Sequence, residues 1–243
     1  MLVSIITAAY NSEKTIARTL ESVYCQTYEY LEYIVVDGGS TDSTMDIVKK
    51  YQKKFEEKGI AFHYLSEKDD GIYDAMNKGI RLAAGKLIGM INSDDWYEPE
   101  AVACAVKHYE EQPYDLFYAD LRIVSENGES FIKRAKNSRW VTSRYWNHPT
   151  TFIPKALYEK YPYRNKTLHD DWELILRIRK AGAKVCVENK VLANFTRNGI
   201  SHEKSWKKAF ERARIKYQIY RENRYGRWYL VECYGMELAK MVV

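Results

Sequence analysis

Residues 2–11 read LVSIITAAYN, and residues 33–42 read YIVVDGGSTD. Each stretch opens with an apolar run of strand length and then changes to small and polar residues. Strands that are apolar on both faces are typical of parallel sheets covered by helices on both sides. The two stretches therefore predict two buried strands of an α/β fold, each followed by a polar turn.

Strand and helix patterns alternate through the first half of the chain. Further apolar runs of strand length lie at 61–65, 87–91 and 116–118. Between the runs, apolar residues recur at helical spacing, as in Ile72, Met76 and Ile80. This alternation predicts a mostly parallel central sheet flanked by helices.

The second half is less regular. Asn127-Gly128 separates two short runs and predicts a β-hairpin. The segment 140–154 is aromatic and irregular. The runs of the hairpin lie at 121–124 and 130–133, and a helix at 170–180 and a strand at 184–188 are expected to follow.

Composition sets limits on the class of protein. The chain has 243 residues, 46% of them hydrophobic, and a net charge of +5. This excludes wholesale disorder. We find no basic leader and no apolar run of about 18 residues, so neither a signal peptide nor a transmembrane helix is expected. The four cysteines lack metal-ligand or CxxC spacing and predict reduced, mostly buried thiols in a cytoplasmic chain; they are Cys25, Cys104, Cys186 and Cys233.

Polar clusters follow three of the predicted strands, at 10–11, 37–40 and 92–95. Because ligands of parallel sheets bind beyond the carboxyl ends of the strands, these clusters should meet at one edge. In the third cluster, Asp94 and Asp95 are adjacent, and neighbouring carboxylates repel each other unless a cation joins them. Oxygen ligands suit Mg²⁺ or Mn²⁺. Alone, however, the pair is better explained as the N-cap of a helix.

Two other stretches also admit a plain structural explanation. The glycines of 37–42 let backbone approach a ligand, but they equally suit a tight turn capped by Asp42. Asp170-Asp171 begins a predicted helix, where one Asp suffices as a cap and the second could act as a general base. On local grounds the cap is the preferred interpretation.

Together these stretches resemble family 2 glycosyltransferases of the GT-A fold. The resemblance covers about residues 1–200 in the expected order, and the joint match is specific although no single motif is. It rests on SIITAAYN (4–11), VVDGGSTD (35–42), GIYDAMNKG (71–79), NSDD (92–95) and DDWE (170–173). It implies an α/β, Rossmann-like GT-A fold and an activity like that of bacterial surface-polysaccharide transferases.

The resemblance also implies residue roles. Tyr10 matches the aromatic that stacks on the nucleotide base, and Asp95, with Asp94, matches the element that holds Mn²⁺ or Mg²⁺. Asp171 matches the catalytic base for in-line, inverting attack, and His148 lies where relatives often have a histidine near the active site. A packed loop histidine explains His148 equally well. The further residues assigned to the nucleotide-sugar donor are Thr7, Asp37, Gly38, Asp69, Asn77, Ser93 and Asp94.

Two positions depart from the family pattern. Gly38 stands where relatives often have a second acid, and Ser93 replaces the first acid of the metal-binding element. Asp69 matches the acid that often precedes the GIYDA segment, and we expect it to compensate for the acids missing at these positions.

The C-terminal region predicts a basic amphipathic helix. From Glu203 to Arg227 there are nine Lys or Arg and three Glu, a net charge of +6. An aromatic stripe shares one helical face and comprises Trp206, Phe210, Ala213, Tyr217 and Tyr220. Such a helix can lie on an anionic membrane, or its stripe can pack on the catalytic domain; the sequence favours neither.

The predicted organisation is a catalytic domain at 1–202 and a helical appendage at 203–243. The catalytic domain divides into a nucleotide-sugar half at 1–119 and an acceptor half at 120–202. The expected partners are a nucleotide diphosphate sugar, with UDP-glucose or UDP-galactose favoured, and a glycan acceptor linked to polyprenyl diphosphate, with no nucleic acid. The expected location is cytoplasmic, peripheral on the inner face of the membrane.

Two other functions compete with the transferase. A sugar nucleotidyltransferase would need a Gly-rich, basic loop after the first strand, where this chain has AAYN (8–11). A non-catalytic membrane or assembly module would use the basic tail and would tolerate loss of Asp95 or Asp171.

Overall fold

The computed structural model describes residues 1–125, 127–196 and 205–242. Nine strands of the described ranges form one sheet in the order β3-β2-β1-β4-β8-β6-β9-β5, with β7 paired to β6. The strands are β1 (Val3–Ala9), β2 (Leu31–Asp37), β3 (Ala61–Ser66), β4 (Leu87–Met90), β5 (Trp96–Tyr97), β6 (Leu116–Val124), β7 (Ser130–Lys133), β8 (Phe152–Pro154) and β9 (Val185–Thr196). The helices are α1 (Ile16–Tyr24), α2 (Thr44–Glu57), α3 (Ile72–Leu82), α4 (Ala101–Glu111), η1 (Ser143–Tyr145), η2 (His148–Thr150), α5 (Lys155–Lys160), α6 (Asp170–Lys180), α7 (Trp206–Glu222) and α8 (Tyr229–Val242).

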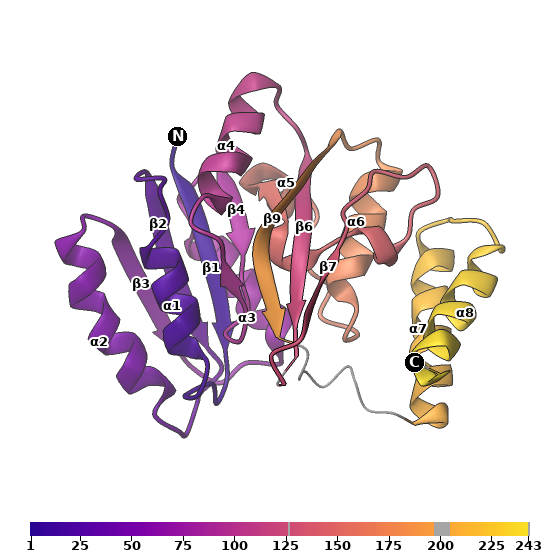
Figure 1. Ribbon diagram of the computed structural model, residues 1–243, viewed down its shortest axis with the longest axis horizontal. Coiled ribbons are helices and arrows are strands. Elements are labelled where there is room, and N and C mark those ends of the chain that lie inside the picture. The colour runs from indigo at the N-terminus through magenta and orange to yellow at the C-terminus, as the bar shows by residue number, and fades with distance from the viewer. Residues whose placement is uncertain (126, 197–204, 243) are drawn as a thin grey trace.

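The first four strands form the predicted parallel sheet. β1 lies between β2 and β4, and β3 pairs with β2, all in parallel. α1, α2 and α3 connect the successive strands. Two parallel strands can be joined only by a long crossover connection, and a helix usually provides it. The carboxyl ends of β1, β2 and β4 therefore lie at one edge of the sheet (Figure 1).

Beyond β4 the sheet is mixed. β8 runs antiparallel to β4 and β6, whereas β9 runs parallel to β6. The predicted hairpin is confirmed as β6 and β7, and the runs at 116–118 and 121–124 are one strand. The boundary expected after residue 119 falls inside β6, so the two halves share a strand. β8 escaped prediction because three residues ending in Pro are too short to show a pattern.

Two hydrophobic cores cover the two faces of the sheet. Successive strand residues point to opposite faces, so Ile5 packs in the core that includes Phe55 of α2, and Ile6 packs in the core that includes Ile80 of α3. Tyr33 and the other inward residues of β1 and β2 are fully buried. Burial of one such side chain contributes about 1.5–3 kcal/mol, and the sheet is therefore a rigid base for the loops at its edge.

α7 and α8 form a helical hairpin beside α6 (Figure 1). Tyr220 of α7 contacts Trp172 of α6, with ring centroids 6.1 Å apart, and stacks on Tyr229 of α8 at 4.2 Å. The predicted aromatic stripe is thus divided, because Tyr220 is buried whereas Trp206 and Phe210 are about half exposed. The predicted start of this helix at Glu203 and the boundary at 202/203 lie outside the described residues.

Within the described ranges, every helix is too short or too polar to cross a membrane.

Candidate active site

Three turns meet at the carboxyl edge of the sheet, as predicted. The turn after β1 bonds to the turn after β2, because the Asn11 amide N donates to Ser40 Oγ at 2.8 Å and Thr41 N donates to Asn11 Oδ1 at 2.9 Å. The turn after β1 also bonds to the turn after β4 through the hydroxyls of Ser12 and Ser93, 2.7 Å apart. The polar clusters therefore form one continuous surface.

The turn after β2 has Asp37 at its centre. The carboxylate of Asp37 is fully buried and accepts bonds from Ser40 N at 3.0 Å and Ser66 Oγ at 2.6 Å. These contacts hold the turn in shape and use the carboxylate of Asp37 inside the fold. Tyr10, by contrast, is 63% exposed at the same edge.

Asp69 lies against the position where the second acid is missing. A Cβ on Gly38 would come within 2.6 Å of Asp69 Oδ2, so a side chain there would collide with this carboxylate. Asp69 Oδ1 accepts a bond from Gly71 N at 2.9 Å. The carboxylate of Asp69 thus occupies the space that a side chain at position 38 would take. In this way another loop supplies an acid to the turn after β2.

Two residues assigned to the donor have structural roles instead. Thr7 is fully buried within β1, and its hydroxyl is 2.9 Å from the Tyr33 hydroxyl of β2. Asn77 of α3 donates to Tyr163 O at 2.9 Å and accepts from Tyr163 N at 3.1 Å. The polar groups of both side chains are thereby used inside the fold. Thr7 faces inward from a strand, and Asn77 of α3 is held by the backbone of Tyr163.

The acidic pair after β4 contains one buried and one accessible carboxylate. Asp95 is fully buried, and its Oδ1 accepts a bond from Thr196 N at 3.1 Å. Its Oδ2 has no hydrogen-bond partner among the described residues. Asp94 is partly exposed. The accessible carboxylate of the pair is therefore that of Asp94, although the resemblance favours Asp95 for direct metal contact.

This pair is electrostatically costly without a cation. Burial raises the pKa of Asp95 well above its ordinary range, and the charge of Asp94 raises it further. Burial also raises the pKa of Asp94. A buried carboxylate with an unpaired oxygen, beside a second carboxylate, fits a divalent cation with oxygen ligands.

Arg18 fixes the loop that carries the pair. Its guanidinium lies 3.6 Å from the ring centroid of Trp96 and donates to Asp94 O at 2.8 Å and Thr196 Oγ1 at 2.9 Å. Burial lowers the pKa of Arg18, while Asp95 and Asp94 oppose that effect. Arg18 and Thr196 were missed from the sequence, because they lie in α1 and β9 and belong to no local motif.

The second acidic pair starts α6. Asp170 is buried and accepts bonds from Lys166 N at 2.9 Å and Thr167 N at 2.8 Å. Asp171 is partly exposed, and its Oδ1 accepts from Trp172 N at 2.6 Å. The positive end of the helix dipole stabilises the Asp171 anion.

Tyr73 and His148 lie near Asp171. The pKa of Tyr73 is raised by burial first and by the charge of Asp171 second. Burial lowers the pKa of the half-buried His148, and Asp171 opposes this shift. Tyr73 is in the first turn of α3, at the carboxyl edge of the sheet, and its hydroxyl donates to Leu168 O at 3.1 Å, so the start of α6, which carries Asp171, lies at this edge.

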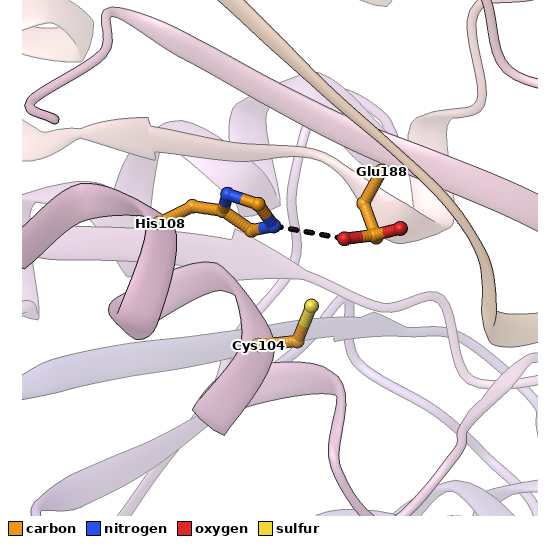
Figure 2. Close-up of side chains that lie close together, drawn as sticks. All are labelled: Cys104, His108 and Glu188. Carbon is orange, nitrogen blue, oxygen red and sulfur yellow. Dashed lines mark hydrogen bonds and ion pairs between the residues drawn. The ribbon is translucent and has the colours of Figure 1, made fainter. Parts of the chain in front are cut away.

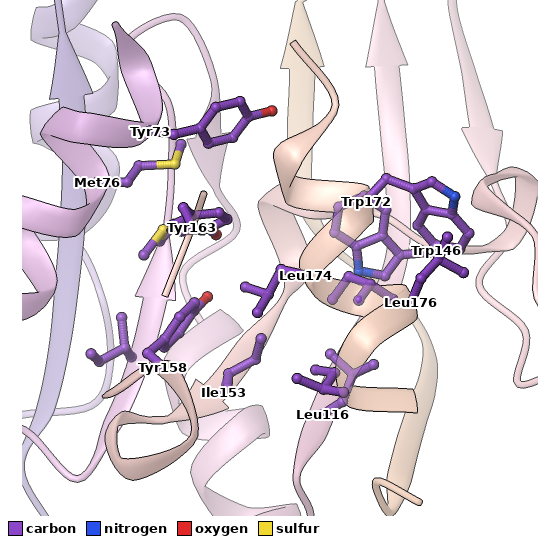
Figure 3. Packing of buried hydrophobic residues seen from close by; sticks show 14 of the residues in the cluster. Tyr73, Met76, Leu116, Trp146, Ile153, Tyr158, Tyr163, Trp172, Leu174 and Leu176 are labelled. Atoms are coloured by element: carbon purple, nitrogen blue, oxygen red, sulfur yellow. Dashed lines mark hydrogen bonds between the residues drawn. The ribbon is translucent and has the colours of Figure 1, made fainter. Parts of the chain in front are cut away.

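Aromatic rings support this part of the site. Trp172 packs on Trp146 with centroids 5.4 Å apart, and Tyr73 packs on Tyr163 at 5.2 Å (Figure 3). These rings belong to the core beneath α6. The side chains at the surface of the site therefore stand on a packed aromatic layer.

A sheet with helices on both faces and acidic turns at its carboxyl edge defines a protein of the GT-A class. The model of Glycosyl transferase family 2 matches residues 4–176, and the chain belongs to this family.

Three similar proteins illustrate the relationship. The chain is 38% identical over 108 residues to chondroitin synthase of Escherichia coli, which covers 44% of this chain and 15% of that protein. A mannosyltransferase, PcManGT from Pyrobaculum calidifontis in complex with GDP-Man and Mn²⁺, superposes with a TM-score of 0.71 at 18% identity, covering 99% of this chain and 74% of that one. TarS residues 1–349 of S. aureus in complex with UDP-GlcNAc gives 0.68 at 21% identity, covering 99% and 72%.

The chain spans 15–49% of the length of the first curated relatives that it matches.

Proposed function

We propose that this protein is an inverting, metal-dependent glycosyltransferase that moves a hexose from a nucleotide diphosphate to a hydroxyl of a glycan acceptor. The observation that carries the proposal is the unpaired oxygen of buried Asp95 beside accessible Asp94, at the edge of the sheet onto which Asp171 opens. One site then offers a place for a cation and diphosphate and a separate carboxylate for the acceptor.

Asp94 and Asp95 are the residues that would hold Mn²⁺ or Mg²⁺. The ion supplies positive charge that stabilises the leaving diphosphate. The accessible Asp94 would make the direct contact, and Asp95 would contribute its Oδ2, which has no hydrogen-bond partner among the described residues. The Mn²⁺ complex of the similar mannosyltransferase supports this choice of metal.

Asp171 acts as the general base. Its carboxylate accepts the proton of the acceptor hydroxyl while that oxygen forms a bond to the anomeric carbon. The bond from this carbon to the diphosphate oxygen breaks on the opposite face, so the configuration inverts. Burial lowers the pKa of His148, which favours the neutral imidazole, and this side chain can hydrogen-bond the acceptor beside Asp171.

The donor is a UDP-hexose of the glucose or galactose type. Tyr10 offers its exposed ring to the base, and Asp69 brings its carboxylate to the turn that Asp37 holds in shape. The UDP-GlcNAc complex of the similar TarS protein supports a uridine nucleotide. The similarity to chondroitin synthase supports a role in bacterial polysaccharide biosynthesis.

The acceptor is linked to polyprenyl diphosphate at the inner face of the cytoplasmic membrane. The α7–α8 hairpin supports this part of the proposal, because Trp206, Phe210, Trp228 and Val231 expose apolar side chains. α7 also carries six Lys or Arg against two Glu. Basic and apolar side chains together favour adsorption to an anionic membrane.

The central test is transfer by purified protein with a panel of nucleotide sugars, with Mn²⁺ and with chelator. Asp171→Asn is expected to lower kcat by about 10²–10⁴-fold, the usual contribution of a general base. The variant should retain the increase in Tm that UDP and Mn²⁺ produce together, since the donor site is intact.

The matched control is Asp46→Asn, an exposed Asp in the first turn of α2, which should behave as the wild type. Wild-type turnover in Asp171→Asn would remove the assignment of the base. Failure of every nucleotide and metal combination to shift Tm would remove the proposed function.

A further inference from the structure

A second group of metal-ligating side chains lies away from the acidic edge. Cys104 and His108 are four residues apart on α4, and Glu188 is on the neighbouring part of β9 (Figure 2). One ligand atom from each side chain lies within 4.8 Å of the others. His108 Nε2 and Glu188 Oε2 are 2.8 Å apart.

The geometry of α4 and β9 explains why the three side chains come together. Residues at i and i+4 of a helix share a face, which puts Cys104 and His108 side by side. Figure 2 shows the thiol and imidazole of α4 directed toward the carboxylate of Glu188. All three side chains are partly buried, so they are ordered but still reachable from solvent.

We propose that Cys104, His108 and Glu188 bind a zinc-type transition-metal ion that joins α4 to β9. Thiolate, imidazole and carboxylate are the three ligand types of zinc sites, with bonds of about 2.0–2.3 Å in tetrahedral geometry. Nitrogen and oxygen ligands of such an ion stand about 3.3 Å apart. The present His108–Glu188 pair needs to open by only about 0.5 Å to admit the ion.

A cavity adjoins this group at His108. A hollow of about 450 Å³ is lined by His108, Cys186 and the segment that begins at Lys184. Three protein ligands with one open position allow water or an exogenous ligand to complete the tetrahedron. The ligand set differs from the all-oxygen pair at Asp94 and Asp95, so a softer ion is expected here.

Without metal the thiol of Cys104 is protonated. Burial raises its pKa to about 11, and Glu188 contributes in the same direction. A thiolate signal at neutral pH therefore reports a bound ion, since binding must displace the proton.

The test is titration of the metal-free, reduced full chain with Co²⁺, followed by absorption spectroscopy. The wild type should bind one Co²⁺ with a near-ultraviolet thiolate-to-cobalt band, and one equivalent of Zn²⁺ should abolish that band. Cys104→Ala should lose the band, and His108→Ala and Glu188→Gln should weaken Co²⁺ binding at least about tenfold.

Two controls separate this site from other thiols and from the catalytic metal. Cys25→Ser removes an exposed cysteine and should leave the band unchanged. Asp95→Asn should also retain it, whatever its effect on transfer. A wild type without the band at equimolar Co²⁺, or a band that persists in Cys104→Ala, would overturn the proposal.

Discussion

At the residue scale, each of the two acidic pairs has one buried and one accessible carboxylate. Asp170 is buried and bonded by backbone N–H groups, whereas its neighbour Asp171 is accessible. Asp95 is likewise buried and bonded by Thr196 N, whereas Asp94 is accessible. In each pair the buried carboxylate fixes the turn, and the accessible one is the carboxylate that we propose contacts a ligand.

Among the residues that the structure describes, Asp95 differs from Asp170 in lacking a partner for one carboxylate oxygen, and this predicts an effect on stability. In chelator, Asp95→Asn should raise the free energy of unfolding at neutral pH by about 1–3 kcal/mol, the usual cost of a buried group without its partner. Thermal or urea unfolding with and without Mn²⁺ measures this gain. Saturating Mn²⁺ should reduce this gain in the free energy of unfolding, because the ion would neutralise the charge of Asp95 in the wild type.

The pH dependence of this stability difference follows from the direction in which the pKa of Asp95 is shifted. The folded-state pKa of Asp95 lies above the unfolded value near 3.8, so the native state binds more protons between these two values. The wild type therefore loses stability as pH rises from about 3.8 through the folded-state pKa. The advantage of Asp95→Asn should shrink toward pH 4; an advantage independent of pH contradicts this origin.

At the element scale, the α7–α8 hairpin depends on a buried ion pair that no periodicity indicated. Glu237 of α8 is 1% exposed and accepts from Arg212 Nε at 2.9 Å and Lys216 Nζ at 2.6 Å. Two of the basic residues of α7 thus join it to α8.

Removal of this carboxylate should loosen the hairpin. Glu237→Ala leaves two largely buried cations without their partner and should cost about 3–5 kcal/mol. Hydrogen exchange of α7 and α8 measures the loss, with Glu222→Ala as the control. Glu222 is in an exposed pair, so its loss should cost less than about 1 kcal/mol. Equal protection in both variants contradicts the assigned role.

At the scale of the whole molecule, the sheet edge and the helical hairpin are separate surfaces. The first gathers the turns after β1, β2 and β4 with the start of α6, and the second exposes Trp228 at 77% between α7 and α8 (Figure 1). A transferase acting on a lipid-linked acceptor needs both a polar site and a means of reaching the bilayer.

Binding to anionic vesicles tests this arrangement. The protein should sediment with phosphatidylglycerol vesicles and less with neutral phosphatidylcholine, and added salt should weaken the interaction. Trp228→Ser should reduce sedimentation several-fold, because an exposed aromatic anchor is lost. Trp172→Phe, a buried control, should not. Equal sedimentation with neutral vesicles, or none with anionic ones, contradicts a basic membrane surface.

The sequence by itself determined the parallel half of the sheet and the edge at which the site lies. Apolar runs such as 33–36 bury both faces of a strand, and the polar residues that follow must then collect at the carboxyl ends. Tyr10 and Asp94 are accessible at that edge for this local reason.

Only the tertiary structure decided which polar residues face a ligand and which face the interior. Thr7 and Asn77 bond within the fold, and Arg18 reaches the acidic loop from another element. Of the four cysteines, which the sequence predicts to be mostly buried, one is exposed, two are partly buried and one is buried. Cys104 meets Glu188 only through the packing of α4 on β9. The physical reason is that strand and helix periodicity encode burial along one element, whereas partners from distant segments are set by packing between elements.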